Sequence, residues 1–477
     1  MMNNKEKYIR ECEKIKTTEK FKHETAEKMR ESLQTKKHSK ARRMLKWAVP
    51  SAVAAILVCV FVILPGINPQ TVSAKENLMD GITAQPVTAI GKEGENTDFI
   101  NAQADFSVKL FKNTVKKGKN SLVSPPSVSL ALGMAANGAK GDTLKDFEGV
   151  LGGGMDIESL NRELAWESTS LRSVKEGKIN IANSIWYDNK GLSVRKNFLQ
   201  KNADYFGAGA FSLDFADKNT LPAINGWVKE NTGGKIDKAI DRITPDNVMY
   251  LINAVYFEQG WQSIYQSSSK GTFHAAGKDV TSNFMYSTEV YLHDNESDGI
   301  LKPLKGGRYS FAAILPKKGI GVSDYVNGMT AEKYLSLVKP AKEILSKFTE
   351  NGKIPKNYKE TYAISSLPKF KYDYSLSLKE ALKSMGLNNA FDSGKADFSN
   401  MGKSGKGNIF IGDVMHKTFI QVDELGVKAG AYTGELMAGA GEPPVNRVTF
   451  DRPFVYAIVD NETCLPLFIG TVENPNA

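Results

Sequence analysis

The polar residues of this 477-residue chain do not form the patterns that usually carry catalysis. The sequence has no GxSxG nucleophile elbow, no HExxH zinc motif, no CxxC pair and no GxxxxGK[ST] phosphate loop. The stretch from Asp294 to Gly299 has some features of a calcium loop, but its twelfth position is Lys305, where a bidentate Glu is required. We therefore expect a solvated turn there, and neither a metal site nor a cofactor.

Histidine is the remaining candidate for acid–base or ligand chemistry. Two of the five His lie in the N-terminal tail, and His274 and His293 stand alone in polar surroundings. His416 lies in a strand-like run and shares one face with Val414, Thr418, Ile420 and Val422. A lone His on such a face is more often a core residue than a base, but a buried imidazole needs hydrogen-bond partners.

The elements that would position these residues predict an α+β fold. Behind Thr97, a candidate N-cap, apolar residues recur at helical spacing at Phe99, Ala102, Phe106 and Leu110. Helical patterns cluster in the first half of the chain and strands in the second, without a βαβ rhythm. The strand-like runs cover residues 248–257, 408–422, 454–460 and 466–472.

The net charge of +9 belongs to the N-terminal tail. Residues 1–46 hold 15 Lys and Arg against 7 Glu, which leaves 47 basic against 46 acidic residues for the rest of the chain. The main body therefore lacks the bulk positive charge of a nucleic-acid-binding protein, and we expect no nucleic-acid partner.

An uncharged stretch follows this tail from Trp47 to Ala74. Its apolar part, residues 47–65, is about long enough to cross a hydrocarbon core of roughly 30 Å as a helix. Basic residues flank only its N-terminal side, so residues 1–46 are expected in the cytoplasm, with the rest of the chain held outside the cell membrane. The alternative is a signal peptide cleaved near Ala74, which would release a secreted protein.

The three cysteines do not suggest a disulfide-dependent domain. Cys12 lies in the tail, Cys59 in the hydrophobic segment and Cys464 alone in the main body. Residues 66–97 mix Gly, Pro and charge and are interpreted as an extracytoplasmic linker. The folded domain is therefore expected over residues 98–477, without an internal disulfide.

One segment combines the features of a loop and a strand. Residues 424–441 read ELGVKAGAYTGELMAGAG, a composition typical of an exposed loop. From Val427, however, every second residue is small and uncharged, as in a strand that buries one face (Val427, Ala429, Ala431 and Thr433).

The motifs taken together resemble the serpin family. NSLVSPPSVSLAL (120–132) is similar to the serpin segment that enters a helix buried under the main sheet, and the likeness continues through NAVYF (253–257) and LPKF (367–370). It includes residues 416–426 and closes with DRPFVYAI (451–458) and PLFIG (466–470). The resemblance covers about residues 98–475 and implies helices around three β-sheets, with a loop able to insert into the main sheet. The N-terminal segment is interpreted as that of a prokaryotic-type member.

The resemblance assigns structural roles to several residues. Ser124, Ser127, Asn253 and His416 match the shutter, a polar cluster beneath the central strands where the sheet must open. Trp261 matches the breach at the top of the sheet. The hinge of the reactive-centre loop matches Glu424, Gly426, Val427, Ala429, Ala431 and Thr433.

The implied function is inhibition of a serine protease, and the chain itself is not an enzyme. The protease attacks the loop and forms an acyl-enzyme, and insertion of the loop then traps it. Counting forward from Glu424 places the cleaved bond at Ala440–Gly441, whereas counting back from Pro453 places it at Glu442–Pro443. We favour the first because proline is a poor residue after the bond, with Leu436 or Met437 as the fallback.

Small residues at this bond favour an elastase-like or subtilisin-like target outside the cytoplasm, bound covalently by a monomeric inhibitor. Two alternatives remain open. The chain could be a non-inhibitory serpin that acts as a binding or structural module, or it could inhibit a papain-like cysteine protease.

Overall fold

The computed structural model describes residues 76–85, 87, 96–172, 176–190, 192–243, 248–349, 360–405, 407–427 and 446–477. The chain divides into two units, Met1–Gln70 and Thr71–Ala477, and every described residue belongs to the second. The expected tail and hydrophobic segment, residues 1–65, therefore lie outside the described part. Within the described part, no helix combines the length and apolar character needed to cross a membrane.

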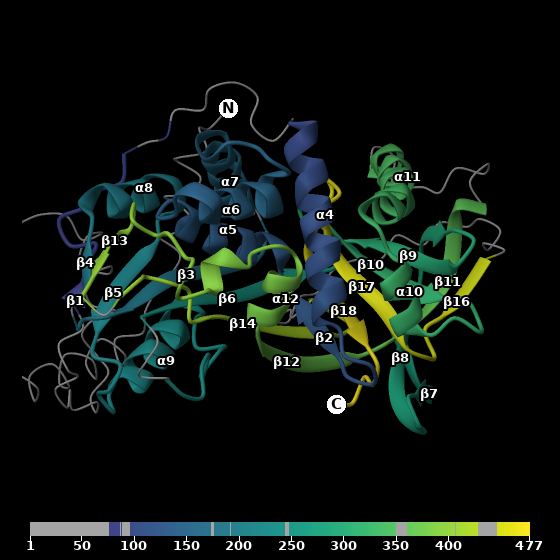
Figure 1. Cartoon of the computed structure of the whole chain (residues 1–477). Coiled ribbons are helices and arrows are strands. Elements are labelled where there is room, and N and C mark those ends of the chain that lie inside the picture. Colours follow the sequence, from purple (N-terminus) through teal and green to yellow (C-terminus); the bar gives the residue numbers. More distant parts are fainter. Residues whose placement is uncertain are drawn as a thin grey trace, which may run out of the picture. The chain divides into compact units, whose positions relative to one another are not determined.

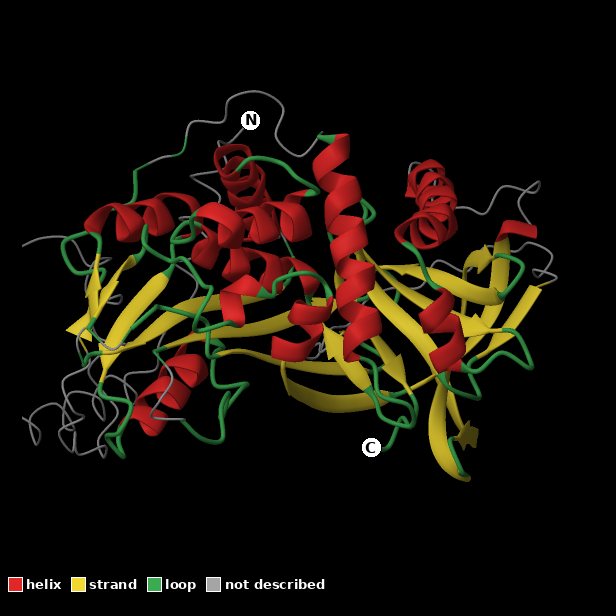
Figure 2. Ribbon diagram, in the orientation of Figure 1, coloured by secondary structure: helices red, strands yellow, loops and turns green. Residues whose placement is uncertain are grey.

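The second unit has the expected α+β fold, with helices packed on two large sheets (Figures 1 and 2). Helices also occur late in the chain and strands early, so the expected division into a helical first half and a β second half is only approximate. The helices are α4 (Thr97–Thr114), α5 (Pro125–Ala136), α6 (Gly141–Gly152), α7 (Ile157–Arg172), α8 (Lys196–Phe206), α9 (Thr220–Asn231), α10 (Val322–Gly328), α11 (Ala331–Thr349) and α12 (Lys379–Ser384), with a 3-10 turn, η2, at Asn389–Phe391.

The first sheet has seven strands in the order β1-β5-β3-β6-β15-β14-β12. Their bounds are β1 (Glu76–Asn77), β5 (Gly209–Leu213), β3 (Lys178–Asp188), β6 (Met249–Gly260), β15 (Gly426–Val427), β14 (Asp413–Val422) and β12 (Phe370–Ser377).

The second sheet has nine strands, eight of them in the order β16-β11-β8-β9-β10-β17-β18-β2, while β7 pairs with β8 off this path. Their bounds are β16 (Asn446–Thr449), β11 (Tyr362–Pro368), β8 (Lys278–His293), β9 (Ser297–Pro303), β10 (Tyr309–Pro316), β17 (Phe454–Asp460), β18 (Pro466–Val472), β2 (Ser121–Val123) and β7 (Ser267–Ala275). A third sheet pairs β13 (Gly402–Ser404) with β4 (Leu192–Val194).

The strand β6 runs through the middle of the first sheet and is covered on both faces. Helices α5 to α8 lie on one side of the sheet and α9 on the other (Figures 1 and 2). The alternation of β6 side chains divides them between two cores: Leu251 and Val255 join the larger core, whereas Ile252 and Ala254 pack with α9 residues such as Ile224. Burial on both faces explains the continuous apolar sequence of this strand.

Two local features differ from expectation. The N-cap of α4 is Asn96, whose side chain accepts hydrogen bonds from the backbone N–H groups of Asp98 and Phe99, and Thr97 is the first helical residue. Part of the expected linker, residues 76–85, is attached to the domain, because β1 pairs with the edge strand β5. A strand of two residues is too short to show a period in sequence.

Candidate functional site

The centre of the first sheet contains a parallel strand pair that opens towards one end. β6 and β14 are directly paired from Asp413↔Tyr250 to Thr418↔Val255. Beyond this stretch β15 lies between them and pairs with both. The two strands are therefore joined directly over about half of their length and are separated by Gly426–Val427 at the level of Val422 and Gln259.

The short strand β15 is antiparallel to both of its neighbours. Val427 lies opposite Val422 on β14 and opposite Gln259 on β6, and Gly426 lies opposite Gly260. The Val427 side chain is buried, with 1% of its surface exposed. Glu424, Gly426 and Val427 are the hinge residues that the structure describes, whereas Ala429, Ala431, Thr433 and the expected bond Ala440–Gly441 lie outside the described residues.

Trp261 holds the turn that leads into β15. Its side chain is fully buried, and its Nε1–H donates to the carbonyl of Asp423 at 2.8 Å. The Trp261 backbone N–H donates to the carbonyl of Leu425, and that of Tyr265 donates to the carbonyl of Glu424, both at 3.0 Å. Three consecutive carbonyls before β15 are thus satisfied by two aromatic residues.

Glu424 is tied to the same end of the sheet by its side chain. It forms an ion pair with Lys369 and accepts a hydrogen bond from Ser268 Oγ at 3.3 Å. Burial alone would raise the pKa of Glu424, but the hydrogen bond and charge of Lys369 outweigh it and lower this pKa. Glu424 therefore stays ionised and anchors the turn to the start of β12.

The four residues matched to the shutter come together under the paired part of β6 and β14. His416 and Asn253 occupy opposite positions on the two strands, and both are fully buried. Asn253 Nδ2 donates to the carbonyl of Ser127 at 3.0 Å and also contacts Ser127 Oγ. Ser124 contributes its backbone N–H, which donates to His416 Nε2 at 3.1 Å.

These contacts determine the state of the imidazole. Nε2 accepts from the Ser124 N–H, so the ring proton lies on Nδ1 and is donated to Asn253 Oδ1 at 2.6 Å. Burial lowers the pKa of His416 to about 3, which keeps the ring neutral. The Ser124 hydroxyl takes no part, since its Oγ has no hydrogen-bond partner among the described residues.

Several residues that complete the site carry no separate sequence signal. Asn183 on β3 accepts a hydrogen bond from Asn253 Nδ2 at 2.5 Å, which extends the cluster to a third strand. Tyr265 and Asp423 belong to the hinge contacts through backbone groups. The distances along the chain between these partners explain why spacing alone does not reveal them.

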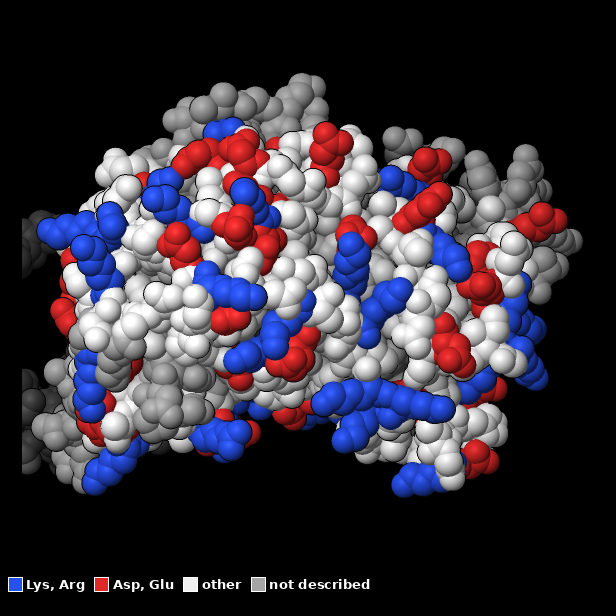
Figure 3. Space-filling view, in the orientation of Figure 1, with Lys and Arg blue, Asp and Glu red and all other residues white. Residues whose placement is uncertain are grey.

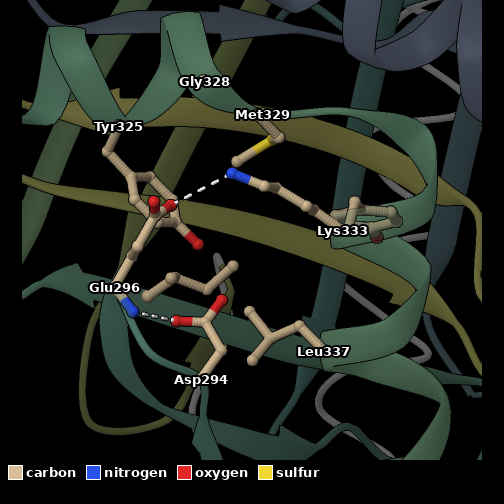
Figure 4. Close-up of a pocket in the computed structure, with 9 residues that line it drawn as sticks. Asp294, Glu296, Tyr325, Gly328, Met329, Lys333 and Leu337 are labelled. Carbon is tan, nitrogen blue, oxygen red and sulfur yellow. Dashed lines mark hydrogen bonds and ion pairs between the residues drawn. The ribbon is translucent and has the colours of Figure 1, made fainter.

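A small cavity away from this sheet lies between α10, α11 and the β8–β9 turn (Figure 4). Lys333 Nζ reaches Glu296 Oε2 at 3.3 Å across it, and the Glu296 N–H donates to Asp294 Oδ1 at 2.8 Å. Its volume of about 10 Å³ holds at most one water molecule. Asp294 caps this turn by accepting the backbone N–H of Ser297. Over the described ranges there is no group of three or more His, Cys, Asp and Glu residues that could hold a metal ion.

Charged side chains of both signs are interspersed over the face shown in Figure 3.

The family assignment follows from a comparison with known protein families. The model for "Serpin (serine protease inhibitor)" matches residues 101–475. The chain belongs to the serpin family. This serpin has the fold that the resemblance implied, and the family is one of protease inhibitors.

Relatives span nearly the whole serpin domain. A serpin-like protein of Thermococcus kodakarensis is 30% identical over 427 residues, covering 86% of this chain and 93% of its own. Leukocyte elastase inhibitor A of Mus musculus is 30% identical over 395 residues, covering 79% and 99%. Among solved structures, the thermophilic serpin tengpin in its native state is 43% identical with a TM-score of 0.75, covering 84% of this chain and 99% of tengpin.

Proposed function

We propose that this serpin inhibits a serine protease by inserting its cleaved reactive-centre loop between β6 and β14. The observation that carries the proposal is the position of β15. Gly426 and Val427 already lie between these strands and run antiparallel to both, so residues that follow in the same direction would extend an existing strand. The loop segment after Val427 then completes the sheet.

The register supports this proposal. Six residues beyond Val427, Thr433 falls opposite His416 when counted along β14 and opposite Asn253 when counted along β6. His416 and Asn253 are themselves direct partners in the present sheet, so the new strand fits between them without a slip of either neighbour. Ala429, Ala431 and Thr433 share the parity of the buried Val427, and their small side chains suit that face.

The shutter cluster would then hold β6 and β14 together in the native state and release them when the loop inserts. His416, Asn253, Ser124 and Ser127 satisfy one another through hydrogen bonds that can be exchanged when the strands part. The native state is held by a kinetic barrier above a more stable inserted state. Trapping depends on insertion that is faster than hydrolysis of the acyl-enzyme.

The proposed target is an elastase-like or subtilisin-like protease cleaving at Ala440–Gly441, outside the cytoplasm. The small residues on both sides of this bond suit a shallow primary pocket. The uncharged segment 47–65, flanked by basic residues only on its N-terminal side, supports membrane attachment in a prokaryotic-type member, with secretion after cleavage near Ala74 as the alternative. Relatives described as inhibitors, such as leukocyte elastase inhibitor A, fit the inhibitory role.

A non-inhibitory role is the second candidate. Thyroxine-binding globulin, whose solved structure holds thyroxine, has the same fold at 23% identity. Against this role stand the small residues of the hinge and the position of β15.

Incubation with a panel of proteases tests the proposal. A covalent complex that survives boiling in detergent with an elastase-like or subtilisin-like enzyme supports it. Complete cleavage of the loop by every enzyme, with no complex, would favour the non-inhibitory role, and a complex formed only with papain-like enzymes would change the target class.

A further inference from the structure

A buried ammonium group lies directly behind the hinge contacts. Lys302 on β9 has a side chain that is 2% exposed, and its Nζ lies 2.5 Å from Glu289 Oε1, on a side chain that is 8% exposed. Burying two charges removes their hydration, a cost that a close pair offsets only in part. An apolar pair of similar size would fill this place at lower cost, which indicates that the ammonium has a further role.

The ammonium of Lys302 contacts the two aromatic residues of the hinge. Its Nζ lies 4.3 Å from the ring centroid of Tyr265 and 5.4 Å from that of Trp261. The two rings meet edge to face, with their centroids 5.7 Å apart and their planes at 85°. Both distances are within the range of a cation–π interaction, which is strongest when the partners are shielded from water, as they are here.

These two residues supply the three N–H groups that hold the turn before β15. Trp261 donates to the carbonyls of Asp423 and Leu425, and Tyr265 donates to that of Glu424. A continuous series of contacts therefore runs from Glu289 through Lys302 and the two rings to the turn. The turn leads directly into Gly426 and Val427, which are seated between β6 and β14.

We propose that Lys302 is a positioning residue that keeps the hinge seated in the sheet and thereby sets the rate of loop insertion. This inference rests on the proposed function, because it assumes that insertion proceeds from Val427. If the Trp261 ring shifts, the Asp423 carbonyl loses its Nε1–H donor, the turn is held only by the backbone N–H groups of Trp261 and Tyr265, and Gly426–Val427 can leave the sheet more easily. β6 and β14 can then pair along their whole length, as they already do from Asp413 to Thr418, and insertion must first separate them.

The test compares wild type with Lys302→Met, Lys302→Arg and the double variant Lys302→Met/Glu289→Gln. The double variant is the matched control because it leaves no uncompensated charge behind. The loop of each purified full-length protein is cleaved, and the gain in resistance to heat is followed over time as the measure of insertion. The unfolding temperature of each uncleaved protein is measured in parallel to detect a purely structural effect.

We expect Lys302→Met and the double variant to insert about tenfold more slowly than wild type, and Lys302→Arg to recover most of the rate. Before cleavage, the double variant should unfold at nearly the same temperature as uncleaved wild type. After cleavage, its loop should still insert more slowly than that of wild type. Insertion of the double variant at the wild-type rate would overturn the proposal, since Lys302 would then serve only as the counter-charge of Glu289. If Lys302→Met does not fold, the double variant alone decides.

The design separates this inference from the proposed function. A wild-type protein that gains heat resistance after cleavage but forms no covalent complex would defeat the inhibitory role, while the rates of the variants would still decide the role of Lys302. A wild-type protein that gains no heat resistance after cleavage would defeat both.

Discussion

His416 and Asn253 face each other across the parallel strands β14 and β6, with His416 Nδ1 2.6 Å from Asn253 Oδ1. The contact joins residues 163 positions apart and closes the sheet at the level that Thr433 would occupy after insertion. This hydrogen bond is present in the native sheet and must break if the loop inserts between the two strands.

The first prediction concerns the stability of the native state at low pH. The native pKa of His416 is about 3, below its ordinary value of 6.5, so between these values the unfolded state binds the proton and the native state does not. The contribution of His416 to native stability is therefore complete above about pH 6.5 and is lost as the pH falls towards 3, by roughly 1.4 kcal/mol per pH unit at most. The urea midpoint of the native protein, measured between pH 7 and 4, should fall accordingly.

His416→Gln removes this titration, so its midpoint should depend less on pH than that of wild type. His274→Gln is the matched control, because His274 is exposed. An equally steep pH dependence in His416→Gln would assign the acid sensitivity to other groups.

The second prediction concerns the parity of the loop. Ala429→Arg places a charge on the buried face of the proposed strand. Gly430→Arg places it on the opposite face, between the partly exposed Phe419 and Tyr256, whose hydroxyl contacts the carboxylate of Glu258, so that a counter-charge lies nearby. An uncompensated buried charge costs several kcal/mol, so insertion of Ala429→Arg should become slower than deacylation. The ratio of covalent complex to cleaved, uncomplexed protein is measured on gels. Ala429→Arg should give mainly cleaved protein, as a substrate does, whereas Gly430→Arg should give mainly complex, as an inhibitor does.

Equal behaviour of the two variants would show that the loop does not enter the sheet in the register set by Val427.

The sequence predicts those strands that an apolar run is enough to identify. The strands at 454–460 and 466–472 were expected from continuous apolar runs, and β17 and β18 have these bounds. The run 408–422 was expected as one strand, but β14 begins only at Asp413. The order of the strands in the sheet, and the position of β15 between two parallel strands, depend on pairings between distant residues that composition and period do not encode.

The site was predictable only where the family resemblance supplied it. Ser124, Ser127, Asn253 and His416 were matched to one cluster, and the structure brings them together. Asn183 and Tyr265 were missed because an amide on a strand and a backbone N–H have no local sequence signature. Lys302 was missed for a related reason: a lysine inside a strand gives no indication in sequence that it is buried and paired.

The third prediction identifies the cleaved bond. Incubation with an elastase-like or subtilisin-like protease should release a C-terminal peptide beginning at Gly441, because Ala440 is expected to occupy the primary pocket. Mass spectrometry of that peptide gives its first residue directly. A peptide beginning at Ala438 or earlier would instead assign cleavage to Met437 or Leu436, as a chymotrypsin-like partner would prefer.

The fourth prediction concerns residues 47–65. The full-length chain should remain with membranes during cell fractionation, and the domain beyond residue 75 should be digested by protease added outside. Sodium carbonate washing is the control for peripheral association. Recovery of a soluble chain that begins at Lys75 would show that the segment is a cleaved signal peptide.

After cleavage, the loop is expected to become a strand between β6 and β14. The most direct measurement is the unfolding temperature before and after cleavage within residues 436–442, with Ala429→Arg treated in the same way. If the loop inserts, the unfolding temperature rises sharply for the cleaved wild-type protein and much less for Ala429→Arg. An unchanged unfolding temperature after complete cleavage of the wild-type protein would contradict it.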